Sequence, residues 1–286
     1  INVAEENSNY LSNNGVLYNK NRSTLLQYPG GLSSVNILDE VTSIGESAFY
    51  GCRCLTDICL PNGVRRIEEN AFSDCSSLTS IDMPEDLNRI GWCTFENCSS
   101  LTSISLPEDL SSIGENAFED CSSLSSIDLP KGLERIGANA FQGCSSLTSV
   151  DLPDSLTEIE SGTFLGCNSL TGINLPKGIN NIGNYAFNDC GSLENIKVDE
   201  GNTVYDSRDG CNAIIETKSN TLIIGSTKTL IPFSVTSIGA YAFGGRSGLN
   251  KIDLHEGVIS IGYNAFSGCS GLTSIEIPEG VASISS

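Results

Sequence analysis

Cysteine, histidine and carboxylate side chains are the groups through which this sequence could do chemistry. Eight of its twelve cysteines recur in a ladder, mostly with a step of 23 residues: Cys52, Cys75, Cys98, Cys121, Cys144, Cys167 and Cys190, then Cys269. Zinc sites use clustered cysteines or histidines at C-x₂₋₄-C spacing, and the gap in Cys52-Arg53-Cys54 is too short for that pattern. We therefore expect no metal site.

The ladder cysteines also predict free thiols. Equivalent residues of stacked copies would have α-carbons about 5 Å apart, within disulfide range, but parallel Cα–Cβ vectors do not easily give the required S–S dihedral. We expect these side chains to be small buried hydrophobic groups.

The sequence favours no catalytic constellation. The single histidine, His255, stands where most copies carry a proline that ends a strand, which predicts a solvent-exposed corner. Without a second histidine, a Ser/His/Asp arrangement has little to build on. Acidic residues recur at the same variable positions, so no pair is singled out, and their spacing lacks a calcium loop. The prediction is a protein without enzymatic activity, catalytic residues or cofactors.

The 23-residue interval extends to every large apolar residue, in the unit L-x-x-I-x-L-P-x-x-L-x-x-I-G-x-x-A-F-x-x-C-x-x. In one copy Ile127 and Leu129 alternate with Asp128, the period of a strand with one buried face, and Pro130 ends it. A second extended piece ends at Ile136. A tight turn around the Ala-Phe pair then brings the chain back.

One such coil cannot fold alone. Ordering each residue costs about 1 to 2 kcal/mol, and the apolar side chains of one coil offset that cost only if neighbours cover them. The sequence thus predicts a repeat solenoid: a leucine-rich-repeat arc of 23-residue coils, with a continuous parallel sheet on one face and short strands or 3₁₀ turns on the other.

Two stretches interrupt the period and resemble each other, each with an Asn and a Tyr before a Gly (Asn7 and Tyr10, Asn202 and Tyr205). Both are interpreted as β-hairpin modules. The predicted organisation is a single solenoid over 1–286: an N-terminal module at 3–44, regular repeats at 45–197, an inserted module at 198–237, and further repeats at 238–286 that are incomplete at the C-terminus. The insertion is predicted to lie between complete coils, which it need not disturb.

The repeat unit, found over nearly the whole chain, resembles the BspA-like leucine-rich repeats, also called the Treponema pallidum type. This resemblance implies a secreted or cell-surface protein of bacterial type. No initiator methionine or signal peptide precedes Ile1, so we expect a piece of a longer protein and base localisation on the resemblance.

Charge limits the partners. Thirty-five acidic and fifteen basic residues give a net charge of -20, a field that repels nucleic acids and anionic membranes. No apolar run approaches the 18 residues of a membrane-spanning helix. We expect neither nucleic-acid binding nor membrane insertion, and a protein partner of basic character.

The outward positions of the predicted sheet are the candidate binding face, because solenoids present their sheet as an extended docking surface. The candidates are polar and mostly acidic: Asp57, Asp82, Ser105, Asp128, Asp151, Asn174, Asp253 and Glu276. No aromatic residue lies among them, which disfavours a glycan held by ring stacking.

Two functions remain open. The resemblance favours an adhesion or protein-interaction module that binds host extracellular matrix or another cell's surface protein. The alternative is a structural spacer that holds another domain away from the cell. The sequence leaves the oligomeric state open.

Overall fold

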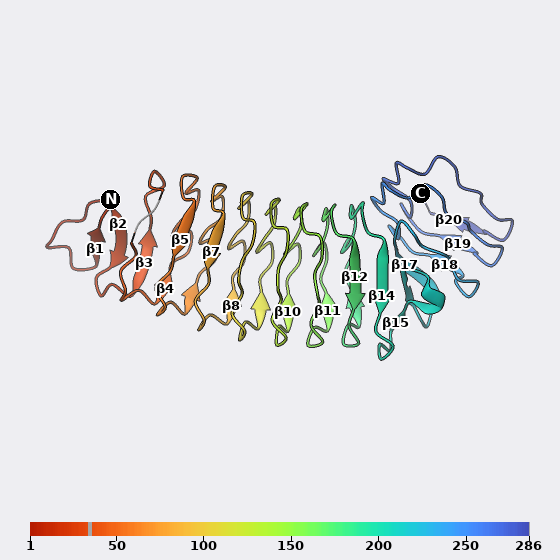
Figure 1. Cartoon of the computed structure of the whole chain (residues 1–286), viewed down its shortest axis with the longest axis horizontal. Coiled ribbons are helices and arrows are strands. Elements are labelled where there is room, and N and C mark those ends of the chain that lie inside the picture. The colour runs from red at the N-terminus through yellow and green to blue at the C-terminus, as the bar shows by residue number, and fades with distance from the viewer. Residues whose placement is uncertain (34–35, 286) are drawn as a thin grey trace.

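The structure, a computed structural model, describes residues 1–33 and 36–285. It is a solenoid whose coils follow one another along one axis (Figure 1), as the repeat predicts. Residues 34–35, in the N-terminal module, and Ser286, in the last predicted repeats, lie outside the described residues.

Each regular coil contributes a two-residue strand that ends in the repeated isoleucine. We call these strands the isoleucine ladder: β4 (Ser43–Ile44), β6 (Arg66–Ile67), β8 (Arg89–Ile90), β9 (Ser112–Ile113), β10 (Arg135–Ile136), β11 (Glu158–Ile159), β13 (Asn181–Ile182), β18 (Ser237–Ile238), β19 (Ser260–Ile261) and β20 (Ser283–Ile284). Neighbouring strands pair in parallel, isoleucine opposite isoleucine. Pairing is interrupted between β6 and β8, between β10 and β11, and between β13 and β18.

The leucine-proline stretch of the repeat forms the second face. It contains β5 (Asp57–Cys59), β7 (Ser80–Asp82), β12 (Gly172–Leu175) and β14 (Asn195–Val198), while other coils make only the bridges Asp82–Ser105 and Ser126–Ser149. The sheet on this face lies in separate pieces, whereas the sequence predicts a continuous one. A proline limits the length of this extended segment in most coils. It follows paired segments such as β12 as well as unpaired ones, so it does not by itself explain where the pairing is interrupted.

Hydrogen-bonded turns connect the ladder back to the core. Two positions four residues apart have left-handed backbones in each regular coil, such as Asn116 (φ 54°) and Asp120 (φ 55°). Asn, Asp and Gly tolerate this conformation best, which explains their recurrence there. The turns also link coils, since the Phe118 N–H donates to the Ala140 carbonyl at 2.8 Å. Among the described residues the one 3₁₀ helix is η1 (Arg208–Gly210).

A column of phenylalanine rings fills the core. From Phe49 to Phe187 the successive rings are buried and stacked, with centroids 4.8 to 5.6 Å apart, and Tyr28 covers the first of them. Beside the rings, each ladder cysteine after Cys52 donates its S–H to the phenylalanine carbonyl of the preceding coil, as Cys121 does to Phe95 at 3.1 Å; Cys52 donates to the Tyr28 carbonyl instead. The thiols therefore connect neighbouring coils as well as filling space.

Each hairpin module leads into the ladder. The first comprises β1 (Tyr10–Asn13), β2 (Val16–Asn19) and β3 (Thr24–Gln27), and the second β15 (Tyr205–Asp206), β16 (Ala213–Glu216) and β17 (Thr221–Gly225). Their strands pair antiparallel until β3 and β17 join β4 and β18 in parallel. Asn7 and Asn202 play the same part in both, each accepting two backbone N–H bonds at 2.9 Å.

The inserted module divides the hydrophobic core in two, although from the sequence it need not disturb the coils. The buried residues form two clusters, and β16 lies between them: Ile214 packs in the first, while Ala213 and Ile215 pack in the second. Alternate side chains of one strand thus serve two cores. The ring column restarts beyond this wall with Phe243 and Phe266, and the last coils are turned relative to the main stack (Figure 1).

Arg246 joins the two cores. It stands at the ladder cysteine position and is 1% exposed. Its Nε donates to the Gly225 carbonyl at 2.8 Å, and its Nη1 donates to the carbonyls of Phe187 at 2.7 Å and Gly244 at 2.9 Å. Arginine replaces the cysteine whose thiol would donate to the Phe187 carbonyl, and its longer side chain supplies that donor.

Candidate binding face

The structure places all eight predicted site residues at the surface. Five of them follow one line along the stack, which we call the outward row: Asp82, Ser105, Asp128, Asp151 and Asn174. Asp57 lies in the neighbouring line, because it pairs with Ser80 while Cys59 pairs with Asp82. The row continues past Asn174 to Lys197, its partner on β14, where a basic side chain ends the acidic run.

The row is held in place by the buried residues next to it. Ile81, Ile104 and Ile127 point into the core from the positions just before Asp82, Ser105 and Asp128. Strand alternation therefore turns the row outward. At one point the face is hollowed to about 520 Å³, where the pairing lapses between the Ser105 and Asp128 coils and Lys131 stands at the edge.

The carboxylates of the row are open to a partner. In the described part of the chain, Asp82, Asp128 and Asp151 make no ion pair, unlike Asp154, which Lys177 contacts at 3.2 Å. Asp128 and Asp151 stand on successive coils, about 4.8 Å apart, and Asp82 stands two coils before Asp128. Such a line of carboxylates attracts a partner with matching positive charge and steers its approach.

Asp253 and Glu276 are less favourably placed than the sequence predicts. Both are exposed, but their segments form no strand. The segment before them in the chain, residues 226–229, folds into a turn in which the Ser226 N–H donates to Thr229 Oγ1 at 2.7 Å, so it offers no strand edge for pairing. Lys251 also neutralises Asp253 through an ion pair of 2.8 Å.

The ladder thiols and the histidine ring, which are the candidate reactive groups, are packed against other residues. Burial raises the pKa of Cys98 to about 12 and that of Cys190 to about 11, so these thiols are poor nucleophiles. The prediction of a solvated His255 is wrong: the ring is half-buried, lies 5.0 Å from Phe233, and has Nε2 2.9 Å from the Pro232 carbonyl oxygen. Within residues 1–33 and 36–285, no group of three or more potential metal ligands occurs.

A charged hollow on the isoleucine ladder has no counterpart in the predicted site. It measures about 400 Å³ and contains Trp92, Arg89 and Arg135. Trp92 is 48% exposed. Arg135 is committed to Glu160 at 2.8 Å and Glu115 at 3.8 Å. The sequence signal is the recurrence of arginine just before the ladder isoleucine.

No helix in the described ranges combines the length and the apolar composition needed to cross a membrane.

Comparison with known families matches the chain to the BspA type leucine rich repeat region, in six copies over residues 23–145, 112–216 and 224–286. No curated protein matches the chain.

Solved structures show the same architecture. A leucine rich cell surface protein from Faecalibacterium prausnitzii A2-165 is 28% identical with a TM-score of 0.78, covering 98% of this chain and 86% of its own. A leucine-rich repeat protein from Bacteroides ovatus ATCC 8483 is 30% identical with a TM-score of 0.62, over 96% and 85%. The T. pallidum leucine rich repeat protein is 31% identical with a TM-score of 0.55, over 60% and 82%.

Proposed function

Because the chain belongs to the BspA-type leucine-rich repeat family, we propose that it is a protein-binding scaffold displayed outside the cell, an adhesion or protein-interaction module. The solved relative from F. prausnitzii is described as a cell surface protein, which supports the location. The outward row carries the proposal, since Asp82, Asp128 and Asp151 are exposed, in line and free of ion pairs in the described residues. The partner is a protein with a basic patch, from host extracellular matrix or another cell's surface.

The test is binding of the chain to extracellular-matrix proteins at two salt concentrations. The variant D82N/D128N/D151N should lose the salt-sensitive part of the affinity, because screening weakens exposed charge pairs. A matched control, E46Q/E134Q/E279Q, removes the same charge from exposed positions outside the row and should bind like the parent. If both triple variants bind with the same affinity, the outward row is not the binding surface.

The spacer function is the alternative, supported by the extended stack itself (Figure 1). A spacer would bind no partner through the row, so neutralising it would change no interaction. Replacing or deleting one regular coil would then alter function only through length.

A further inference from the structure

The isoleucine ladder opens at the junction between the two cores. On its far side β13 has no strand partner among the described residues, because the next ladder strand, β18, pairs with β17 and β19 instead. The opening is a cavity of about 510 Å³ between residues 181–188 and 239–241, closed on one side by β16 and β17. This volume lies in the range of small-molecule sites, and such sites favour junctions between packed units.

Tyrosines line up along this opening. Tyr185 and Tyr241 contact each other edge to face with ring centroids 4.7 Å apart, and Tyr263 continues the row at 5.5 Å from Tyr241. Tyr185 and Tyr263 are 44% and 46% exposed. We call these three residues the tyrosine ridge.

The backbone makes the ridge unusual. Tyr185 and Tyr241 have φ values of 60° and 55°, in the left-handed region where bulky residues are strained. The equivalent position in four other coils is asparagine, which tolerates this conformation: Asn70, Asn116, Asn139 and Asn264. Strain of this kind persists only where the surroundings hold the backbone in place, and it clusters at ligand sites.

The lining of the cavity is amphipathic and carries no positive charge. Ile182 and Ile223 give it apolar surface, Asn181 and Asn184 add amides, and Glu216 adds one carboxylate. A ligand with an apolar face and many hydroxyls fits this combination, because aromatic rings take C–H faces while amides and carboxylates bond hydroxyls. The missing arginine and lysine disfavour an acidic ligand, and β13 is too short to pair with an extended peptide.

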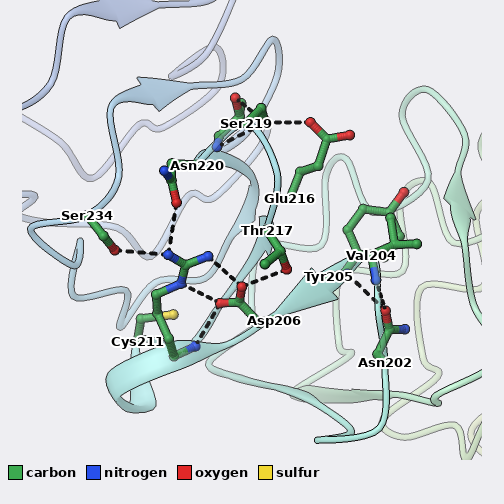
Figure 2. A network of polar contacts seen from close by, with 12 residues as sticks. Asn202, Val204, Tyr205, Asp206, Cys211, Glu216, Thr217, Ser219, Asn220 and Ser234 are labelled. Carbon is green, nitrogen blue, oxygen red and sulfur yellow. Dashed lines mark hydrogen bonds and ion pairs between the residues drawn. The ribbon is translucent and has the colours of Figure 1, made fainter.

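A polar network holds the module beside the cavity. The Arg208 guanidinium donates from both Nε and Nη2 to the Asp206 carboxylate. Its Nη1 donates to Asn220 at 2.9 Å and to Ser234 at 3.2 Å. Figure 2 shows Asp206 and Thr217 facing each other in this network. The cavity wall that contains Glu216 is thus fixed to the loop before β18, so the cavity is preformed.

We propose that the tyrosine ridge and the junction cavity bind a neutral oligosaccharide. This site is separate from the outward row, so the oligosaccharide proposal and the protein-binding proposal can be tested independently.

The test is titration of the chain with cellotriose, maltotriose and chitotriose, followed by ligand-observed NMR and calorimetry. At least one should bind at up to about 10 mM, and Y185N/Y241N should weaken it at least about tenfold, because buried aromatic contacts dominate such sites. Asparagine suits these backbone positions, so the variant should melt no lower than the parent.

Tyr50, which is 54% exposed on a distant coil, provides the matched control: Y50S should bind like the parent. The proposal is overturned if none of the three sugars binds, or if Y185N/Y241N binds as tightly as the parent. It is also overturned if the ridge variant instead loses binding to a protein from the matrix panel.

Discussion

Replacing Arg246 tests how the two cores are held together. The substitution R246M keeps much of the side-chain length but removes every donor, so the carbonyls of Phe187, Gly225 and Gly244 all lose their guanidinium bonds. Burial lowers the pKa of Arg246, yet an arginine keeps its proton at neutral pH. The parent therefore buries a charge held by three charge-assisted hydrogen bonds.

The magnitude follows from two opposing effects. Each buried acceptor left without a donor costs about 1 to 3 kcal/mol, which gives about 2 to 6 kcal/mol for the Phe187 and Gly225 carbonyls. The Gly244 carbonyl keeps the Asp189 N–H as a donor at 3.1 Å. Removing a buried charge returns several kcal/mol of desolvation cost. We expect R246M to lose about 2 kcal/mol of unfolding free energy, with R246K losing less because it retains part of the donor set.

Urea unfolding measures the loss, and hydrogen exchange locates it. Amides of β18 to β20 should exchange faster in R246M, while those of β8 to β10 should be unchanged, since stability in a solenoid depends on nearest neighbours. The control C144A removes one S–H donor inside the regular stack, where Cys144 contacts Phe118 at 3.2 Å, and should affect the main stack instead. An R246M free energy within about 0.5 kcal/mol of the parent would refute the reasoning.

Three further predictions concern the coils and the inserted module. An alanine Cβ at Gly137 would lie 2.6 Å from the Glu115 nitrogen, whereas one at Gly132 would meet nothing within 4 Å. In urea unfolding, G137A should therefore lose about 1 to 3 kcal/mol of unfolding free energy and G132A almost none. Equal losses would contradict the steric argument. Iodoacetamide should label only the exposed Cys54 and Cys59 in the folded chain, as read by mass spectrometry, with the buried thiols reacting only on unfolding. Burial alone would raise the pKa of Asp206, but hydrogen bonds from Arg208 and Thr217 lower it. The stability advantage of the parent over D206N should therefore be full above the ordinary pKa of 3.8 and shrink as the pH falls below that value. A difference in melting temperature that stays constant with pH would contradict this.

The regular coils could be predicted from the sequence because their signals are local and repeated. Alternation around Ile127 predicts the strand face, and the recurrence of Phe118 and Cys121 at one interval predicts their burial in a shared column. The hydrogen bond from Cys121 to Phe95 could not be predicted, because it depends on the stagger of one coil over the next.

The junction could not be predicted because it occurs once. Arg246 is a single exception in the cysteine ladder, and nothing local shows that a carbonyl of Phe187 needs its donor. Tyr185 and Tyr241 are far apart in sequence, so their contact appears only when the inserted module is folded between them. Aromatic residues are missing from the predicted sheet face, whereas the tyrosine ridge lies on the ladder side.

The wall formed by β16 has a consequence for how such a chain can evolve in length. A regular coil presents equivalent surfaces above and below, so duplicating or deleting one between residues 45 and 197 would recreate the same interface. β16 is different on its two sides, with Ile214 facing one core and Ile215 the other, and has no interchangeable copy. Each duplicated coil within the regular part would therefore move the junction about 4.8 Å further from the N-terminal module. The residues that form the junction would stay the same.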